Sequence, residues 1–329
     1  MIFSKTPLRM SFVGGGSDLP GFYRKFGGSV LSTSIARYIY IAVNRKFDGR
    51  IRVSYSRTEE VDEVKAVEHP LVRHSLDLVG VDKGVEIGSF ADIPSQGSGL
   101  GSSSSYTVGL LHALYAFSGR YVSKDQLAAE ACEIEIGRCQ EPIGKQDQYA
   151  AAYGGLNLIE FHPDEAVTVN PVICSNETRN AFEDNILVFF TGRTRSASVV
   201  LARQSKAIEA SDRQELLKRM AALAYDMKRL LESGDVNSLG AVLDENWRLK
   251  AQLSDGITDS EVDRWYKTGL SAGAVGGKLL GAGNGGFMMF LAPPERHPAI
   301  VNALSVLRQT QFPFDRNGTQ IAFFQPSSE

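Results

Sequence analysis

The sequence predicts an α+β protein with two domains, and three observations support this prediction. The chain has 329 residues, which is enough for two domains of ordinary size. Runs rich in β-branched and aromatic residues, typical of strands, occur in both halves beside segments of helical apolar periodicity. A polar segment at 175–180 separates two apolar patterns. We therefore expect one domain at residues 1–180 and a second at residues 181–329.

The first half is expected to combine a mixed or antiparallel sheet with several helices. Strands are expected at residues 2–11, 28–44, 50–55, 84–91, 156–161 and 166–172. Pro7 is expected to break the first of these strands. Helices are expected at residues 70–79, 106–117 and 124–138, with a shorter one that ends at a glycine pair, Gly154 and Gly155.

The second half is expected to alternate strands with helices. A buried strand at 186–190 is followed by helical patterns at 199–232, 235–253 and 259–271. The glycine-rich segment 278–286 runs into a strand that ends at Phe290. Residues 298–310 are expected to be helical and residues 319–324 to form a closing strand.

Composition and charge favour small-molecule partners over nucleic acids and membranes. The net charge is −3, and no dense block of Lys and Arg occurs that would indicate a nucleic-acid surface. No apolar run reaches the length of a membrane span, and no signal peptide is recognisable, so we expect a cytoplasmic protein. The three cysteines match no metal-ligand spacing, which suits a reducing compartment. Nothing in the sequence indicates the oligomeric state.

Two classes of hydrolytic site are disfavoured by the motifs. The five histidines are scattered and form no ligand set, so no catalytic zinc is expected. No Gly-x-Ser-x-Gly turn occurs, which argues against a serine hydrolase.

A glycine- and serine-rich stretch, Pro94–Ser105, is the strongest candidate for a phosphate site. Gly97, Gly99 and Gly101 allow tight turns and a close approach of the backbone to a ligand, and the stretch opens a helix. Unpaired N–H groups and the helix dipole stabilise an anion at such a helix start. The alternative interpretation is a flexible loop that merely caps the helix. Neither a Walker A sequence nor a Gly-x-Gly-x-x-Gly fingerprint is present.

Two further glycine clusters join regular elements elsewhere in the chain. The first is Gly14-Gly-Gly-Ser-Asp18 after the opening strand, and the second lies within Lys278–Phe290. Each permits a close backbone approach, and together they suggest one site at a domain interface. Transfer of a phosphoryl group from a nucleotide triphosphate requires a metal, cations and a residue that orients the attacking hydroxyl.

The chain offers a candidate for each of these needs. Asp147, before a helix of small residues, is the candidate base, with helix capping as the alternative. Ser103 and Glu135 supply the oxygen ligands that Mg²⁺ prefers, although the pattern does not separate Glu135 from Glu133. Arg9 is the candidate cation near the first glycine cluster.

Other basic residues are candidates for charge neutralisation or for a second phosphate. Lys145 lies two residues before Asp147, where its charge would lower the pKa of the aspartate. Arg193 and Arg195 follow a buried strand and would suit a second phosphate or a carboxylate, with an exposed loop as the alternative.

Three separated motifs resemble those of the GHMP small-molecule kinases. They are Pro7–Asp18, Pro94–Ser105 and Lys278–Phe290, and they span nearly the whole chain in the order found in that family. The resemblance implies an N-terminal domain like the second domain of ribosomal protein S5 and a ferredoxin-like C-terminal domain, with ATP and Mg²⁺ between them.

The resemblance also implies roles for individual residues. ATP is expected to bind at Gly97, Ser98, Gly99, Leu100, Gly101, Ser102, Ser103 and Ser104. Ser103 and Glu135 are the expected Mg²⁺ ligands, Asp147 resembles the catalytic base of galactokinases, and Arg9 matches a basic residue beside the transferred phosphate. Substrate contacts are expected from Gly15, Gly16, Ser17, Asp18, Lys145, Arg193, Arg195, Gly283 and Gly285.

Within the family, two segments together point to a sugar phosphate as substrate. Gly14-Gly-Gly-Ser-Asp-Leu-Pro20 paired with Glu141–Gly155 is most similar to the branch that acts on heptose 7-phosphate. That similarity implies phosphorylation of the anomeric hydroxyl. The alternatives are a kinase for another sugar, such as fucose, a hexose or a galactose-like sugar, and a non-catalytic regulator that binds nucleotide or sugar on the same scaffold.

Overall fold

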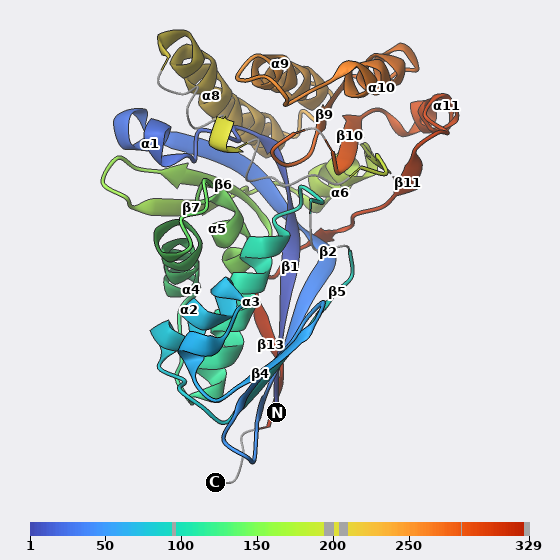
Figure 1. Cartoon of the computed structure of the whole chain (residues 1–329). Helices are drawn as coiled ribbons and strands as arrows, with labels where there is room; N and C mark the ends of the chain where they lie inside the picture. The colour runs from blue at the N-terminus through green and yellow to red at the C-terminus, as the bar shows by residue number, and fades with distance from the viewer. Residues whose placement is uncertain (94–96, 194–200, 204–209, 284, 326–329) are drawn as a thin grey trace.

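Figure 1 shows the computed structural model, which describes residues 1–93, 97–193, 201–203, 210–283 and 285–325. Within these residues the strands form a nine-stranded and a four-stranded sheet. Helices accompany both sheets, as expected for an α+β protein. The amino group of Met1 lies 2.7 Å from the carbonyl oxygen of Gln325, so the two ends of the described chain meet at the foot of the large sheet.

The centre of the large sheet is the long antiparallel pair β1 (Ile2–Val13) and β2 (Gly28–Arg45). The sheet runs in the order β13 (Gln320–Phe324), β1, β2, β5 (Val85–Ala91), β3 (Ile51–Ser54), β4 (Thr58–Val61). Outside this path, β2 also pairs with β6 (Leu156–Phe161) and β12 (Phe314–Asp315), and β6 pairs with β7 (Val167–Pro171). Strands β3 and β5 are parallel, and the other pairings are antiparallel.

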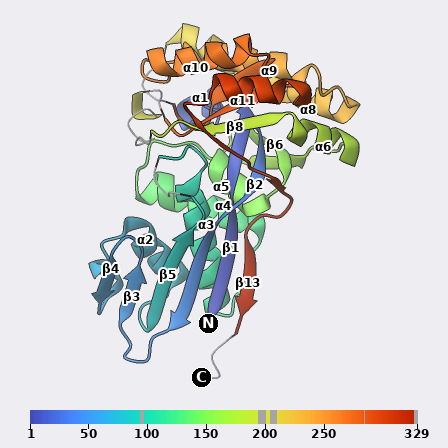
Figure 2. The ribbon, with the colours of Figure 1, turned by 90° about the vertical axis from the view of Figure 1, so that its right-hand side faces the viewer.

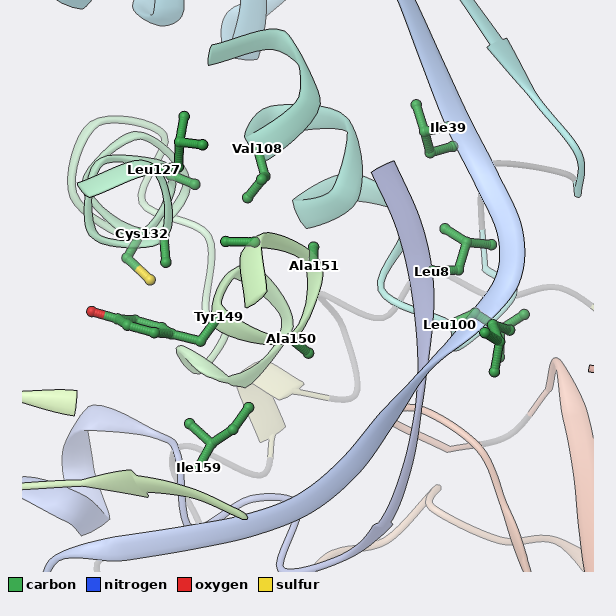
Figure 3. Packing of buried hydrophobic residues seen from close by; sticks show 14 of the residues in the cluster. Leu8, Ile39, Leu100, Val108, Leu127, Cys132, Tyr149, Ala150, Ala151 and Ile159 are labelled. Carbon is green, nitrogen blue, oxygen red and sulfur yellow. The ribbon is translucent and has the colours of Figure 1, made fainter. Parts of the chain in front are cut away.

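Four helices cover one face of this sheet, as Figures 1 and 2 show. They are α2 (Pro70–Val79), α3 (Ser102–Phe117), α4 (Lys124–Cys132) and α5 (Gln146–Tyr153). Figure 3 shows apolar side chains of α3, α4 and α5 packed together beside β1 and β2. Ala150, Ala151 and Ala152 are buried, and their small side chains let α5 pack closely within this layer. Two short helices, α1 (Pro20–Phe26) and α6 (Asn176–Asp184), lie nearer the second sheet.

The second sheet has the strand order of a ferredoxin-like domain. Its order is β11 (Arg308–Thr310), β8 (Ile186–Phe190), β10 (Phe287–Leu291), β9 (Gly276–Leu279), and every pairing is antiparallel. Numbered along the chain this is 4-1-3-2. Helices α8 (Ser211–Ser233), α9 (Leu239–Ala251) and α10 (Ser260–Ser271) separate the first two strands, and α11 (His297–Ala303) separates the last two.

Both faces of the small sheet are buried, so the two halves of the chain share a core. Leu187, Phe189 and Phe290 pack with aromatic residues of α9 and α10. Val188 and Met289 point the other way and belong to the cluster that contains the core of the large sheet. This alternation follows the period of two in a strand. The small sheet therefore packs against α9 and α10 on one face and against the core of the first half on the other.

Three expected features differ in the structure. Strand β1 continues through Pro7, which lies opposite Tyr38 beside a register shift, a place where a strand accommodates proline. The helix expected to reach residue 310 ends at Ala303, because Arg308–Thr310 pair with β8. Strands β12 and β13 return to pair with β2 and β1, so the end of the chain contributes to the sheet of the first half. The boundary near residue 180 stays a prediction.

Candidate active site

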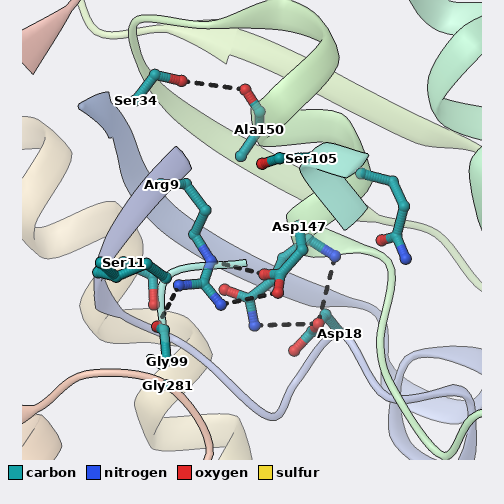
Figure 4. Close-up of polar contacts among 12 residues, drawn as sticks. Arg9, Ser11, Asp18, Ser34, Gly99, Ser105, Asp147, Ala150 and Gly281 are labelled. Carbon is teal, nitrogen blue, oxygen red and sulfur yellow. Dashed lines mark hydrogen bonds and ion pairs between the residues drawn. The ribbon is translucent and has the colours of Figure 1, made fainter. Parts of the chain in front are cut away.

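A cavity of about 230 Å³ lies where the three glycine clusters meet. Its wall contains Gly15 and Gly16 of the first cluster, Gly97, Gly99 and Gly101 of the second, and Gly281 of the third. The side chains of Arg9, Asp18, Ser103, Glu135, Asp147 and Lys250 also line it. Figure 4 shows several of these groups converging between β1, the glycine-rich loops and the start of α5. The site thus draws residues from both halves of the chain.

The second and third glycine clusters touch through their backbones. A Cβ placed on Gly281 would lie 2.4 Å from the Cα of Gly99, and one on Gly99 would lie 2.5 Å from the carbonyl oxygen of Leu280. Both residues have positive φ, 79° and 74°. Any larger residue would force the loops apart, so glycine is required here for close approach as well as for conformation. This contact closes one wall of the cavity.

Helix α3 presents its N-terminus to the cavity. Gly101 precedes the helix in the left-handed conformation and provides no side-chain cap. The first helical residues, Ser102 to Ser104, line the cavity, so their backbone N–H groups are suited to an anion. The helix is held on β1 by Gly109, whose carbonyl accepts a hydrogen bond of 2.7 Å from Ser4, and by Ser105, whose hydroxyl donates to Pro7.

Arg9 and Asp147 form a bidentate ion pair inside the cavity (Figure 4). Arg9 Nε donates to Asp147 Oδ1 at 2.6 Å, and Nη2 donates to Oδ2 at 2.8 Å. The third guanidinium nitrogen, Nη1, donates to the carbonyl of Gly99 at 2.7 Å. Arg9 is 5% exposed, whereas the Asp147 side chain is 23% exposed. The arginine therefore fixes the orientation of a carboxylate that a ligand in the cavity can reach.

Glu135 is a fully buried carboxyl held by neutral donors. Ser103 Oγ donates to its Oε1 at 2.6 Å, and Gln148 Nε2 donates to its Oε2 at 2.6 Å. Burial raises the pKa of Glu135 to about 7 despite these hydrogen bonds. The residue lies in the π-helical segment Glu133–Arg138, a kind of irregularity that is frequent at functional sites. Glu133 points elsewhere and forms an exposed ion pair with Arg138.

The Ser103 hydroxyl and the Glu135 carboxylate suit Mg²⁺ that is also bound by a phosphate. The described residues contain no group of three or more His, Cys, Asp or Glu side chains that could hold a metal by themselves. Mg²⁺ commonly takes one or two protein oxygens and completes its octahedron with water and substrate phosphates. A cation beside Glu135 would also stabilise its charged form, which burial disfavours.

Asp18 also lines the cavity. Its Oδ1 accepts from the N–H of Gly16 at 2.9 Å, and its Oδ2 accepts from the amide side chain of Gln146 at 3.1 Å. Burial raises the pKa of Asp18, and the nearby Asp147 adds to that effect. The side-chain oxygen of Gln146 is buried without a hydrogen-bond partner. Polar atoms of this kind, buried around a small cavity, are suited to binding hydroxyl groups.

Comparison with known proteins identifies the family. The model of the GHMP kinases N terminal domain matches residues 64–155, and that of the GHMP kinases C terminal matches residues 227–306. The D-glycero-alpha-D-manno-heptose 7-phosphate kinase of Campylobacter jejuni is 31% identical over 92% of this chain and 93% of its own length. The chain belongs to the GHMP kinase family.

Two other relatives agree with this assignment. A bifunctional fucokinase/GDP-fucose pyrophosphorylase of Arabidopsis thaliana is 26% identical over 87% of this chain, which spans 29% of that longer protein. The crystal structure of a D-glycero-D-manno-heptose 1-phosphate kinase from Bacteroides thetaiotaomicron matches 97% of this chain and 98% of its own, with 27% identity and a TM-score of 0.80. The expected GHMP kinase fold is therefore confirmed, and the relatives are sugar kinases.

Some of the expected substrate residues of this GHMP kinase lie outside the cavity. Ser17 is buried against β2 and bonds to Gly14 and Ser29. Lys145 points away from Asp147 and donates to Glu165. Arg193 pairs with Asp259 at 2.7 Å and with Glu261 at 3.2 Å.

Residues of the third glycine cluster likewise lie partly inside and partly outside the cavity. Gly281 and Ala282 line the cavity, whereas Gly283 packs against Ile257 and Gly285 against Arg193. Arg195 lies outside the described residues. Of the expected substrate residues that the structure describes, the cavity brings together Gly15, Gly16 and Asp18.

Lys250 is a charged residue of the cavity that sequence analysis did not single out. It lies in the last turn of α9, and its Nζ donates to the carbonyl of Gly281 at 2.7 Å. Burial lowers the pKa of Lys250 to about 8. A sequence signal exists, because Leu239, Leu243, Trp247 and Lys250 follow helical spacing and form the buried side of the helix. A lysine on the buried, mostly apolar side of a helix indicates that its ammonium group reaches a polar site.

None of the helices in the described part of the chain has the length and apolar character that a membrane crossing requires.

Proposed function

We propose that this GHMP kinase transfers the γ-phosphoryl group of ATP to the anomeric hydroxyl of D-glycero-D-manno-heptose 7-phosphate, giving the 1,7-bisphosphate. The observation that carries the proposal is the similarity to the Campylobacter jejuni heptose 7-phosphate kinase along nearly the full length of both chains. The heptose kinase from Bacteroides thetaiotaomicron supports a heptose phosphate as the class of sugar.

The donor side of the proposal rests on the loop before α3. We assign the ATP phosphates to Gly97–Ser104, where the glycine-rich backbone and the N-terminus of α3 favour anions. Ser103 and Glu135 would hold Mg²⁺, which neutralises phosphate charge when it is bound. The cytoplasm, where ATP is available, is the proposed location, and Cys132, Cys139 and Cys174 are free thiols, which suits that compartment.

The acceptor side rests on Asp147 and its neighbours. Asp147 orients the attacking hydroxyl and accepts its proton, while Arg9 holds the carboxylate in place and offsets charge that develops during transfer. Asp18 lines the same cavity as Gly15 and Gly16, interacts electrostatically with Asp147, and is assigned to the sugar hydroxyls. Phosphoryl transfer demands little covalent chemistry from the protein, so positioning and electrostatics supply most of the rate.

A substrate panel tests the proposal. ATP consumption is measured with heptose 7-phosphate, the same heptose without phosphate, fucose and galactose. The proposal expects the highest kcat/KM for heptose 7-phosphate. A higher value for fucose or galactose would assign the enzyme to another sugar. ATP binding without turnover of any of the four sugars would favour a regulatory role.

A further inference from the structure

Lys250 reaches the cavity from the second half of the chain at the point where the glycine loops touch. Its Nζ donates to Gly281 O at 2.7 Å, while Arg9 Nη1 donates to Gly99 O at 2.7 Å. The backbones of Gly99 and Gly281 are in direct contact. Arg9 of β1 and Lys250 of α9 are thus hydrogen-bonded to two carbonyls that lie next to each other. Both face the phosphate-binding loop.

The charges around the cavity leave a polyphosphate poorly neutralised without Lys250. Among the described lining residues the cations are Arg9 and Lys250, and the carboxylates are Asp18, Glu135, Glu141 and Asp147. Arg9 is already paired with Asp147 through two hydrogen bonds. The Lys250 ammonium donates a hydrogen bond to the neutral carbonyl of Gly281, and an ammonium group has three donors.

The other buried lysine of the region has a different role. Lys278 on β9 donates to the carbonyls of Ser11 and Phe12, at 2.8 Å and 2.9 Å, and does not line the cavity. It therefore ties β9 to β1. Lys250 makes no such link to β1 in the described contacts, and its ammonium lies in the cavity wall. Lys278 thus joins two strands outside the cavity, whereas Lys250 donates to the Gly281 carbonyl in the cavity wall.

We propose that the Lys250 ammonium binds the transferring phosphoryl group and stabilises its charge during transfer. The inference deepens the function proposed above, since it rests on ATP as the donor. Lys250 would act on the phosphoryl group together with Arg9, which is anchored to the neighbouring carbonyl. The second half of the chain would thereby supply a charged group to the reaction as well as a wall of the site.

The electrostatic surroundings of Lys250 agree with this role. Burial, with the nearby Arg9, lowers its pKa to about 8, whereas Asp18 and Asp147 oppose that shift. Lys278 is a further cation close enough to interact with it. The lysine is therefore charged below pH 8 and loses its charge as the pH rises above 8. A bound phosphoryl group would stabilise the charged form and raise the pKa.

Three variants test the proposal. Lys250→Met removes the charge and keeps the length, and Lys250→Arg keeps a charge that does not titrate in this range. Arg248→Gln is the matched control, because it removes a cation from the exposed side of the same helix, where Arg248 pairs with Asp244. Turnover, the pH profile of kcat/KM, and the affinities for ADP and for a non-hydrolysable ATP analogue are measured for each.

The proposal expects kcat of Lys250→Met to fall by about 100-fold or more, the range found when one donor to a transition-state charge is removed. The preference for the ATP analogue over ADP is expected to fall by about tenfold, because only the analogue carries the γ-phosphoryl group. ADP affinity should be unchanged, which shows that the loops are intact. Wild-type kcat/KM should decline above pH 8, and this decline should move to higher pH in Lys250→Arg.

Three results would overturn the proposal: wild-type kcat in Lys250→Met, an equal loss of affinity for ADP and the ATP analogue, or a loss confined to sugars that carry their own phosphate. The nucleotide measurements need no sugar. If the wild-type protein discriminates the ATP analogue from ADP but phosphorylates no heptose, the proposed acceptor is wrong and Lys250 is still tested.

Discussion

Asp147 owes its orientation to Arg9, and the two residues act as a unit. The guanidinium makes two hydrogen bonds to the carboxylate and a third to Gly99, so it links the proposed base to the glycine-rich loop before α3. Asp147 also lies in the first turn of α5, where the helix dipole stabilises its negative charge. A charged carboxylate held in one orientation can position a hydroxyl and accept its proton.

Replacing Asp147 by Asn is expected to lower kcat by about 1,000-fold, because the amide cannot accept the proton, and general base catalysis contributes at about this level. ATP affinity should change little, since Asp147 is not part of the phosphate loop. Steady-state kinetics and nucleotide titration measure both effects. Asp125→Asn, an exposed change in α4, is the control and should keep wild-type turnover. Undiminished kcat in Asp147→Asn would exclude this residue as the base.

Glu135 is expected to control the requirement for Mg²⁺. Gln at this position keeps a hydrogen-bond acceptor for Ser103 but loses the carboxylate charge, so the Mg²⁺ concentration for half-maximal activity should rise by about tenfold or more. Glu133→Gln is a matched control two residues away, because Glu133 is exposed and paired with Arg138. An equal Mg²⁺ requirement in Glu135→Gln and wild type would contradict the assignment.

The residues found from the sequence differ from the missed ones in the signal that they carry. Arg9, Ser103, Glu135 and Asp147 lie in or near family motifs, and all four line the cavity. Lys250 lies in a helix outside these motifs. The sequence shows its charge, but the site that the side chain reaches depends on how α9 packs. Lys145 shows the opposite case: a short separation from Asp147 along the chain does not make two side chains point the same way, and Lys145 reaches Glu165 instead.

At the level of elements, the contact between the loops of Gly99 and Gly281 shapes the proposed phosphate site. Gly281→Ala would place a Cβ 2.4 Å from the Cα of Gly99. The clash is with backbone, which cannot move aside as easily as a flexible side chain. We expect the nucleotide affinity to fall by at least about tenfold, an effect equivalent to ~1.4 kcal/mol. Isothermal titration with ADP measures it.

Gly119→Ala is the control for this change. Gly119 has a similar φ of 67°, but a Cβ there would meet no heavy atom within 4 Å. It should lower the free energy of unfolding by about 1 kcal/mol through backbone strain and leave nucleotide affinity unchanged. Equal nucleotide affinities in Gly281→Ala and wild type would show that the loop contact is not needed for binding.

Local pattern predicted most elements but not the ones that depend on distant partners. Helices α2 and α3 and strand β8 carry strong periodic or apolar signals and lie close to the predicted ranges. Residues 308–310 have no strand signal of their own and are extended because β8 offers an open edge. The register of β1 past Pro7 is likewise set by β2. Such tertiary effects override local preference.

At the scale of the whole molecule, the last strand fastens the two ends of the chain together. Figure 2 shows β13 beside β1. Just before β13, Thr319 is buried, and its hydroxyl lies 2.8 Å from Thr6 Oγ1 and 3.1 Å from His112 Nδ1. Partners more than 300 residues apart, such as Thr6 and Thr319, leave no local pattern, so the predicted domain division at residue 180 did not include this return.

A chain that ends at residue 318 is expected to be less stable by about 2 kcal/mol or more, because buried polar groups on β1 and α3 lose their partners and β1 loses paired backbone. Urea unfolding measures the difference. A chain that ends at residue 325 keeps β13 and serves as the control. Identical unfolding midpoints for the two shortened chains would contradict a stabilising role of β13.

The central claim is that Asp147 and the phosphate loop act together on the anomeric hydroxyl of heptose 7-phosphate. The most direct measurement is to incubate the protein with ATP, Mg²⁺ and heptose 7-phosphate and to locate the new phosphate by NMR. The account predicts the 1,7-bisphosphate with the wild-type protein and a strongly reduced yield with Asp147→Asn. A phosphate on another hydroxyl, or equal yields from the two proteins, would contradict it.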